Sequence, residues 1–454
     1  MLIFDRQRRM AVDGLVAAYA DQRLERRVFL RRAVSLGLSL SAASALLTAC
    51  DGGNTSPVSI DVLNVWSGEE LKSFRAVVAP FTSATGIAIN LESTRNLNVA
   101  LTIRLRGNDA PGVAVVPNPS QMRHMAGQNQ LIRLDTFLDM RTMRANYDSD
   151  WLDLASYQGK LYGLVYKAAN KGTIWYNPAQ FNSLDYQIPA TWDDLLALSA
   201  HIAGSGKYPW AMGVENATAS GWPAADWIAE IYLKQFGPDL YDQWVGHQLP
   251  WTHESVRQAF QRFGQVVGGP HYIEGIPQAV LNSSYTSACY EPFSTPPQAY
   301  MNYLGDFATG FIKDRFPKAQ PGVDFAFFPF PTLDPRYVSA VTGSADIVVA
   351  MRDNDAVRQF MTYLSTAKAQ AIWVKRGGAI SVNKALDLQA YPNTVARASA
   401  SMLLKAAPFR FGADDQMPFA VERAFWLKIQ DFIADQSQLD TVLNAIERVA
   451  QQAY

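Results

Sequence analysis

Acidic and amide side chains follow two expected strands of this sequence, at the points where those strands end. Glu69 and Glu70 come just after a strand expected at 60–66, and Asn118, Ser120 and Gln121 follow a buried strand expected at 113–116. Carboxylates accept hydrogen bonds, and amides both accept and donate them. In α/β sheets, ligands bind beyond the carboxyl ends of the strands. These two loops are therefore expected to face a ligand.

The segments around these residues alternate between strand and helix patterns. Strands are expected at 60–66, 87–91 and 113–116, and helices at 71–81 and 97–105, with Gly86 ending the first helix. This order indicates an α/β lobe with a mainly parallel sheet. Further along, 159–163 is expected to be a turn, 191–194 a capping box that starts a helix, and 325–330 an aromatic strand crossing between lobes.

Composition narrows the chemistry that these residues can perform. The 454 residues include 2 Cys and 5 His without a Cys/His cluster, which argues against a zinc site, and no cofactor is implied. No GxSxG, HExxH or phosphate-loop motif occurs. The 11 Trp and 19 Tyr fit a packed core, and they also suit a cleft that contacts a flat ligand face.

The N-terminal segment is expected to direct export. Arg26-Arg27-Val28-Phe29-Leu30-Arg31 resembles a twin-arginine signal, and the apolar run at 34–48 is shorter than the roughly 20 residues of a spanning helix. Leu47-Thr48-Ala49-Cys50 resembles a lipobox, which implies cleavage of residues 1–49, lipidation of Cys50 and a flexible tether at 50–57. An uncleaved anchor helix is the alternative.

Charge argues against nucleic acid as a partner. The whole chain has a net charge of −1, and its first 49 residues hold 8 Lys+Arg and 4 Asp+Glu, so the part from Cys50 onward carries −5. A mildly acidic protein lacks the basic surface that nucleic acids require. With 454 residues, two or more lobes are expected.

Several separated stretches together resemble family 1 of the extracellular solute-binding proteins, and the alpha-glucoside-type receptors most of all. The stretches are VWSGEE at 65–70, TGI at 85–87, APGVA at 110–114, GKLYG at 159–163, WYNP at 175–178, PATWDDL at 189–195, GWP at 221–223, GGAIS at 377–381 and DDQMP at 414–418. The resemblance covers residue 60 to the C-terminus, and it rests on the order and spacing of motifs that are individually weak.

The resemblance implies a periplasmic-binding-protein-like fold of the maltose-binding type, with two α/β lobes, crossing strands and a cleft between them. Residues 58–168 and 332–376 would form one lobe, and 169–331 and 377–454 the other. It implies a receptor, not an enzyme, that captures a di- or oligosaccharide by hinge closure and delivers it to an ABC permease. A monomer is expected, tethered by lipid to the outer face of the cytoplasmic membrane.

The resemblance also assigns sugar-binding residues. Carboxylates and amides are needed for the hydroxyl groups, and aromatic rings for the C–H face of a sugar. In the first half of the chain the candidates are Glu69, Glu70, Arg95, Asn118, Ser120, Gln121 and Asn170. One of the two glutamates is expected to serve only as a helix N-terminal acid, and Glu70 is preferred for the site.

The remaining candidates come from the second half of the chain. They are Glu215, Trp222, Asp306, Phe307, Asp346 and Asp415. Trp222 lies between Gly221 and Pro223 at a helix start, where its indole could stack on sugar or pack in the core. Either Asp414 or Asp415 is expected to face the cleft, and Trp426 is expected in the core. No metal ligand is assigned.

Cys289 departs from the family pattern, in which relatives often pair two cysteines in this region. Ala299 stands where a partner is expected, so Cys289 is predicted to form no disulfide. Two alternative functions stay open. One is the same fold with a non-sugar solute such as a polyamine, which acidic and aromatic residues would also suit. The other is an exported carbohydrate-active enzyme, which needs two carboxylates at a set separation.

Overall fold

The structure is a computed structural model that describes residues 28–29, 31–32, 58–94 and 96–454. Most of the expected signal peptide, the tether at 50–57, Cys50 and Arg95 lie outside the described residues. Ser59–Tyr454 forms a unit of its own, to which the following description applies. None of its helices, nor any other described helix, combines the length and the apolarity needed to cross a membrane.

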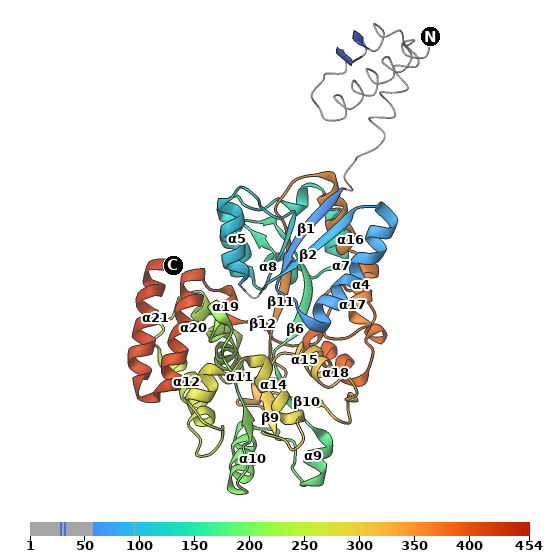
Figure 1. Ribbon diagram of the computed structural model, residues 1–454. Coiled ribbons are helices and arrows are strands. Elements are labelled where there is room, and N and C mark those ends of the chain that lie inside the picture. The colour runs from blue at the N-terminus through green and yellow to red at the C-terminus, as the bar shows by residue number, and fades with distance from the viewer. Residues whose placement is uncertain (1–27, 30, 33–57, 95) are drawn as a thin grey trace, which may run out of the picture. The chain divides into compact units, whose positions relative to one another are not determined.

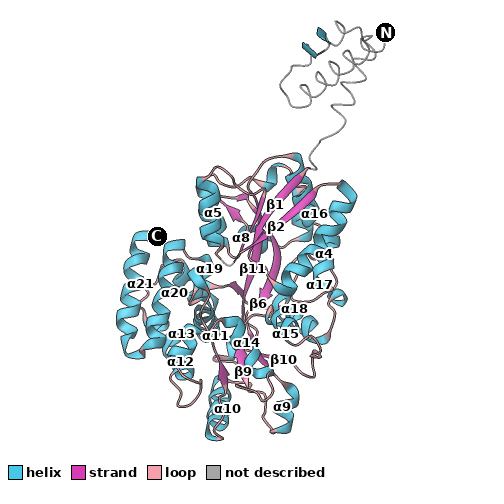
Figure 2. Ribbon diagram, in the orientation of Figure 1, coloured by secondary structure: helices cyan, strands magenta, loops and turns pink. Residues whose placement is uncertain are grey.

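A six-stranded sheet forms the centre of the first lobe (Figures 1 and 2). Its strands are β1 (Ser59–Asn64), β2 (Ala88–Ser93), β3 (Val113–Val116), β6 (Gly163–Asn170), β11 (Val341–Ala350) and β12 (Phe409–Phe411). β2 and β3 pair with β1 in parallel, as the sequence predicts, whereas β11 runs antiparallel to β3 and β6. All four residues of β3 are buried, which suits its unbroken apolar sequence.

Helices cover this sheet on both faces. They are α4 (Gly68–Thr85), α5 (Leu97–Arg106), α6 (Pro119–Gly127), α7 (Met140–Asn146), α8 (Ser149–Leu154), α16 (Asp355–Leu364), α17 (Ala367–Val374) and α18 (Thr394–Leu404). α4 ends at Gly86 as predicted, because Gly86 takes a left-handed conformation with φ 73°. The turn lies at 158–159, one residue earlier than predicted, and joins the short strands β4 (Ser156–Tyr157) and β5 (Lys160–Leu161), so the predicted turn at 159–163 is largely strand.

The second lobe is built on a four-stranded sheet in the order β10, β7, β9, β8. These strands are β7 (Thr173–Tyr176), β8 (Trp210–Ala211), β9 (Met301–Tyr303) and β10 (Ala326–Pro329). Its helices are α9 (Pro178–Ser183), α10 (Trp192–Gly204), α11 (Trp222–Val245), α12 (Glu254–Val267), α13 (Gln278–Asn282), α14 (Tyr285–Tyr290), α15 (Ala308–Arg315), α19 (Ala413–Gln416), α20 (Phe419–Ala434) and α21 (Leu439–Ala453). The predicted capping box is present, because the side chains of Thr191 and Asp194 each accept from the other's backbone N–H.

Each lobe has its own apolar core, and the chain passes between the lobes several times. It crosses from β6 to β7, returns from β10 to β11, and crosses again from β12 to α19. The aromatic segment 325–330 contains a strand, as predicted, but this strand pairs with β7 inside the second sheet, and the crossing follows it. The fold is therefore the predicted pair of α/β lobes with crossing segments.

Core membership differs from the predicted lobe boundaries in one region. The predicted boundaries place residues 377–404 in the second lobe, yet Ile380, Tyr391 and Leu403 are buried in the first core. Ala168 in β6 and Ile380 exchange backbone hydrogen bonds, which attaches this segment to the first sheet. The other boundaries stay a prediction.

A smaller apolar cluster covers the other face of β7. It contains Trp175, Phe325 and Cys289, and the Cys289 side chain is fully buried with a free thiol. Burial raises the pKa of this thiol well above its usual value. Cys289 is therefore an unreactive core residue.

Candidate functional site

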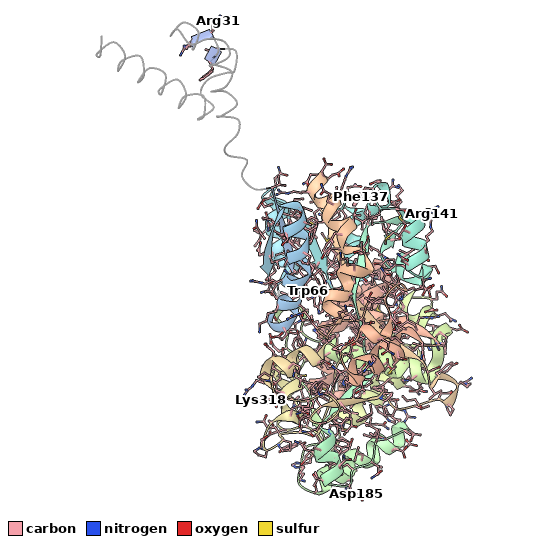
Figure 3. The ribbon with its side chains drawn as sticks, turned by 90° about the vertical axis from the view of Figure 1, so that its right-hand side faces the viewer. Arg31, Trp66, Phe137, Arg141, Asp185 and Lys318 are labelled. Carbon is pink, nitrogen blue, oxygen red and sulfur yellow. The ribbon has the colours of Figure 1, made fainter. Side chains whose placement is uncertain are left out.

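A cavity of about 200 Å³ lies where the two lobes meet. Aromatic side chains form part of its wall: Trp66, Trp222, Tyr285, Phe307, Phe311, Phe419 and Trp426. Polar side chains form much of the remaining wall: Glu70, Asn98, Asn118, Gln121, Lys167, Lys171, Asn216, Thr218, Ser344, Asp346, Asp414, Asp415 and Glu422. In Figure 3, Trp66 lies at a level between Phe137 in the first lobe and Lys318 in the second.

Lys167 forms the centre of the polar wall contributed by the first lobe. Residues 167 and 346 are opposite each other in the β6–β11 ladder, and Lys167 Nζ lies 3.2 Å from Asp346 Oδ2 and 2.8 Å from Glu70 Oε1. Its ammonium group also lies 5.4 Å from the centre of the Phe307 ring. Burial opposes the charge on Lys167, but Asp346 and Glu70 outweigh this effect and raise its pKa. Lys167 is therefore a charged, fully paired wall residue.

Trp66 holds Asp346 from a second direction. Its indole Nε1 donates a hydrogen bond of 2.6 Å to Asp346 Oδ2, the same oxygen that Lys167 contacts. Because both donors reach Oδ2, Asp346 keeps Oδ1 for a ligand. Trp66 comes directly after β1 in the predicted loop, and its ring packs against Phe74 and Trp373. The first strand end thus contributes through an indole as well as through Glu70.

Lys171, at the crossing from β6 to β7, is a second buried lysine that pairs with carboxylates. Its Nζ lies 2.5 Å from Asp226 Oδ1 and 3.4 Å from Asp415 Oδ2, and 5.4 Å from the centre of the Trp222 ring. Burial opposes its charge, but the nearby carboxylates raise the pKa of Lys171. Burial raises the pKa of Asp415 to about 7, with Asp414 adding to the shift and Lys171 opposing it. Lys171 is therefore shared by the carboxylates of Asp226 and Asp415.

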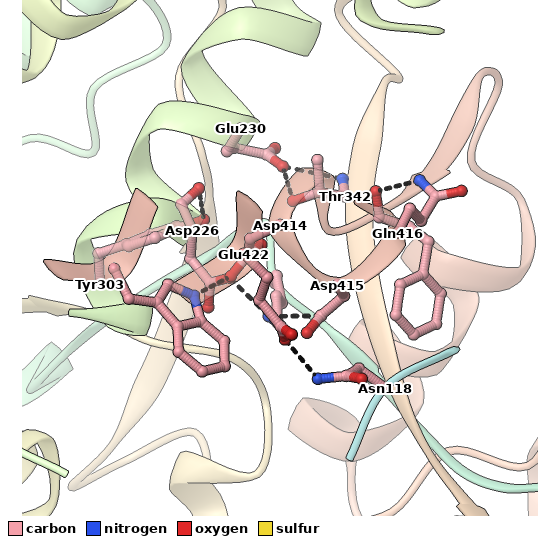
Figure 4. A network of polar contacts seen from close by, with 12 residues as sticks. Asn118, Asp226, Glu230, Tyr303, Thr342, Asp414, Asp415, Gln416 and Glu422 are labelled. Carbon is pink, nitrogen blue, oxygen red and sulfur yellow. Dashed lines mark hydrogen bonds and ion pairs between the residues drawn. The ribbon is translucent and has the colours of Figure 1, made fainter. Parts of the chain in front are cut away.

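Asp414 and Glu422 complete an acidic end of the cavity (Figure 4). Trp426 Nε1 donates to Asp414 Oδ2 over 2.6 Å, and Asn118 Nδ2 donates to Glu422 Oε1 over 2.6 Å. The second oxygen of each carboxylate, Asp414 Oδ1 and Glu422 Oε2, is buried without a hydrogen-bond partner among the described residues. Burial, together with Asp415 and Asp414, raises the pKa of Glu422 well above its usual value. This end of the cavity can accept donors from a ligand.

Seven of the predicted site residues lie together in the cavity wall. They are Glu70, Asn118, Gln121, Trp222, Phe307, Asp346 and Asp415. Asn118 also caps α6 by accepting from the Gln121 backbone N–H. Trp222 packs edge-on against Tyr285 with ring centres 5.0 Å apart and remains half-buried. The loops after β1 and β3 therefore reach the cavity, as expected for strand ends.

Five predicted residues do not line the cavity. Glu69 pairs with Lys72 at 2.6 Å on the surface, as expected for a helix N-terminal acid, and Glu215 Oε1 accepts from the Ala217 backbone N–H. Ser120 is buried in the first turn of α6 outside the wall. Asn170 and Asp306 bind each other beside the crossing instead of facing a ligand. Arg95 lies outside the described residues.

Asp306 is a structural residue of the crossing. It accepts from the Asn170 backbone N–H over 3.2 Å and from the Ser399 hydroxyl over 2.9 Å. Burial raises the pKa of Asp306 to about 6, against the effect of these hydrogen bonds and of Lys167. Asp306 therefore connects three segments that are distant in sequence.

The prediction missed both lysines, Trp66 and Glu422. Lys167 and Lys171 stand four residues apart in the apolar run 163–176, and such a run can bury charges only if it pairs them. Glu422 shares a helical spacing with Phe419 and Trp426, so an acid on an otherwise aromatic face could have indicated a site. Trp426 is buried, as expected, but also contributes to the wall.

The arrangement suits recognition of an uncharged, hydroxyl-bearing ligand. Carboxylates supply acceptors, Asn98, Asn118, Gln121 and Asn216 supply both acceptors and donors, and the aromatic rings supply apolar faces. Within the described part of the chain, no group of three or more His, Cys, Asp and Glu side chains is arranged to hold a metal ion.

Residues 66–371 match the family of bacterial extracellular solute-binding proteins, and the chain belongs to this family. It is 34% identical over 410 residues to the osmoprotective compounds-binding protein GgtB of Synechocystis sp., covering 89% of this chain and 96% of that protein. It is 29% identical over 392 residues to the alpha-glucosides-binding periplasmic protein AglE of Rhizobium meliloti, covering 84% of each. These findings confirm the family that the motifs indicated.

Solved structures show the same fold. The bacterial solute receptor AcbH, described as preferring β-D-galactopyranose, superposes with a TM-score of 0.76 at 20% identity, covering 87% of this chain and 99% of that one. Maltose-bound MalE3 of T. maritima gives a TM-score of 0.72 at 13% identity, covering 87% and 100%. The predicted two-lobed fold of the maltose-binding type is therefore confirmed.

Proposed function

We propose that this protein is the substrate-binding component of an ABC importer, and that it captures a di- or oligosaccharide such as an alpha-glucoside in the cavity between its lobes. The observation that carries the proposal is one cavity wall that combines carboxylates of both lobes with aromatic rings. Sugars present hydroxyl donors and an apolar C–H face, which match these two kinds of group. The name of the Rhizobium meliloti relative supports an alpha-glucoside.

The ligand is held by contributions from both lobes. Asp346 and Glu70 lie on the first lobe, whereas Trp222 and Glu422 lie on helices of the second. A sugar that bridges these groups binds the closed arrangement better than an open one and shifts the population toward closure. The closed form is then recognised by a membrane permease, which receives the sugar.

A lipid anchor places the receptor beside that permease. Cys50 becomes the lipidated first residue after removal of 1–49, and 50–57 acts as a tether. Replacing Cys50 by Ser should release the protein from the membrane fraction and reduce sugar uptake, while sugar affinity stays unchanged because the cavity wall is built from Val65 onward in the sequence. Loss of sugar affinity in Cys50→Ser would contradict this separation of roles.

A ligand screen tests the proposed function directly. The purified full chain is heated with maltose, trehalose, sucrose and their constituent monosaccharides, since a ligand that binds only the folded state raises the unfolding temperature. At least one disaccharide is expected to raise it, with calorimetry giving a defined affinity and chromatography recovering the sugar intact. If no sugar raises the unfolding temperature, the proposed function is wrong. If the sugar is cleaved, the protein is an enzyme instead.

One observation favours a second ligand class. Asp414 and Glu422 each have a buried oxygen that finds no hydrogen-bond partner among the described residues, and a ligand ammonium group would satisfy both while neutralising charge. The same screen therefore includes spermidine. Stabilisation by spermidine without stabilisation by any sugar would assign a cationic solute to the cavity.

A further inference from the structure

Glu422 occupies a position that ordinary packing does not explain. It lies in the first turn of α20, its side chain is fully buried, and it forms part of the cavity wall. A buried carboxylate is costly unless it is paired or fully hydrogen-bonded. Lys171, which also lines the cavity, is already shared by Asp226 and Asp415, and the Arg423 guanidinium donates to the Thr218 carbonyl oxygen. Glu422 thus retains an unmet need for hydrogen-bond donors.

The two oxygens of Glu422 have different surroundings. Oε1 accepts the Asn118 Nδ2 hydrogen bond of 2.6 Å, whereas Oε2 is buried and has no partner in the described structure. The carboxylate therefore has one satisfied oxygen and one that lacks a donor.

The Asn118 contact joins the two lobes. Asn118 follows β3 of the first sheet, and Glu422 stands between Val421 and Phe425 of the second core. Asn118 Oδ1 accepts from the Gln121 backbone N–H over 2.8 Å, which fixes the amide and directs Nδ2 to Glu422. One turn further along α6, His124 stacks on Phe419, with ring centres 5.7 Å apart. The lobes thus meet along one line, and Asn118, Phe419 and Glu422 of that line also line the cavity.

We propose that Glu422 is a ligand-binding residue that couples capture of the ligand to closure of the lobes. Oε2 accepts a donor group of the ligand while Oε1 holds Asn118 of the opposite lobe. This inference rests on the proposed function, because it deepens the role of the same cavity. A ligand donor at Oε2 orients the carboxylate, and the oriented carboxylate strengthens the hydrogen bond from Asn118.

The chemistry of the subsite is that of an acceptor. In its ionised form Glu422 accepts hydrogen bonds only, so the ligand group beside Oε2 in that form is a hydroxyl or an ammonium group and not an anionic one. Asp414 Oδ1, the other unpartnered buried oxygen of the wall, adds a second acceptor at the same end. Neutral maltose and trehalose test whether a hydroxyl group binds at Oε2, and spermidine tests whether an ammonium group does. Glucuronate, which is anionic, is expected not to bind.

Three variants of the full chain separate the two roles. Glu422→Gln keeps an oxygen for Asn118 but can replace the ligand-facing acceptor by a donor. Asn118→Ser keeps an oxygen that caps α6 and removes the Nδ2 donor. Asp431→Asn removes an exposed carboxylate from the same helix and is the matched control. Thermal unfolding without ligand first confirms that each variant is folded.

Calorimetry with the probe that stabilises the wild type then gives the affinities. Glu422→Gln is expected to weaken binding by about tenfold or more, because hydrogen bonds to charged groups are the strong ones. Asn118→Ser is expected to weaken it by about threefold and to reduce the ligand-induced decrease in the radius of gyration measured by X-ray scattering. Asp431→Asn is expected to bind like the wild type.

A mutant cycle tests the coupling itself. In a Glu422→Ala background, adding Asn118→Ser is expected to weaken binding less than it does in the wild type, since only the direct contribution of Asn118 to the cavity wall is then left to lose. Wild-type affinity in Glu422→Gln, or an equal effect of Asn118→Ser in both backgrounds, would overturn the inference while leaving the proposed function intact. Failure of the wild type to bind any probe would instead overturn the proposed function and this inference with it.

Discussion

The indole Nε1 of Trp66 donates a 2.6 Å hydrogen bond to Asp346 Oδ2, joining residues that are 280 positions apart in the chain. Trp66 follows β1, the first strand of the sheet, and Asp346 lies in β11, which returns to the same sheet after the first long segment of the second lobe. Lys167 contacts the same oxygen from β6. The orientation of Asp346 toward the cavity is therefore fixed by two segments that the sequence keeps far apart.

Replacing Trp66 by Phe should weaken both stability and ligand binding. The aromatic ring keeps its packing against Phe74 and Trp373, but the hydrogen bond to a carboxylate is lost, at a cost of about 1.5–3 kcal/mol in the free energy of unfolding. Asp346 then keeps Lys167 alone and can turn, so sugar affinity should fall about fivefold. Chemical denaturation and calorimetry measure the two effects.

Trp192→Phe is the matched control for this prediction. Its indole Nε1 donates to Gln265 Oε1 over 2.8 Å in the second lobe, and Trp192 does not line the cavity. This variant should lose stability and keep its sugar affinity. Equal affinity losses in the two variants would mean that Trp66 acts only through general stability.

Trp222→Ala tests whether aromatic stacking contributes to binding. The half-buried indole lines the cavity and has a cationic neighbour, Lys171, on its ring. Truncation should weaken sugar binding by about 2 kcal/mol, as for central aromatic residues of binding sites. Trp222→Phe retains a ring and should lose less. Calorimetric affinity equal to the wild type in Trp222→Ala would remove this residue from the site.

Much of the fold could be predicted because its determinants are local. Gly86 ends α4 since its own φ of 73° is costly for other residues, and Thr191 with Asp194 starts α10 through hydrogen bonds within four residues. The succession of strands and helices near the N-terminus could be predicted from local hydrophobic patterns for the same reason. The packing of Ile380 in the first core could not be predicted, because it depends on pairing with Ala168, 212 positions away.

Strand position predicted one part of the site, and the family resemblance predicted another. Asn118 and Glu70 follow strand ends, and they reach the cavity. Asn170 and Asp306 have equally suitable side chains, but they bind each other and Ser399, which no short-range pattern encodes. Glu422 depends on a contact across 304 positions with Asn118. Long-range pairing decides which polar residues are left for a ligand.

Stability of the unliganded protein should fall as the pH rises from about 4 to about 7. Burial raises the pKa of Asp415 to about 7 from its ordinary value of 3.8, so the folded state binds a proton that the unfolded state has released. This contribution is fully present below the unfolded pKa and is lost as the pH rises through the folded pKa. The slope attributable to Asp415 is at most about 1.4 kcal/mol per pH unit.

Asp415→Asn should reduce this slope without removing it. Asp306, with a pKa of about 6, and Glu291, whose burial raises its pKa to about 7, contribute in the same direction. Denaturation of both proteins at a series of pH values gives the comparison. An identical pH dependence in the variant would show that Asp415 remains ionised in the folded protein.

Gly221 should be the most sensitive glycine of the site. Its φ is 108°, and a Cβ added there would lie 2.1 Å from the backbone oxygen of Trp426, so both backbone conformation and space exclude a side chain. Gly221 precedes Trp222, and therefore an added methyl group must displace either Trp222 or Trp426, both of which line the cavity. Gly221→Ala should cost about 1–3 kcal/mol of stability from backbone strain alone and also weaken sugar binding.

Gly204→Ala provides the comparison for Gly221→Ala. Gly204 ends α10, and an added Cβ meets no atom within 4 Å. Because alanine favours helix more than glycine does, this variant should be as stable as the wild type or slightly more so, with unchanged affinity. If Gly221→Ala had the same stability and the same sugar affinity as Gly204→Ala, the close approach of the Gly221 loop to α20 would not exist in solution. The position of Trp222 in the cavity wall would then have to be revised.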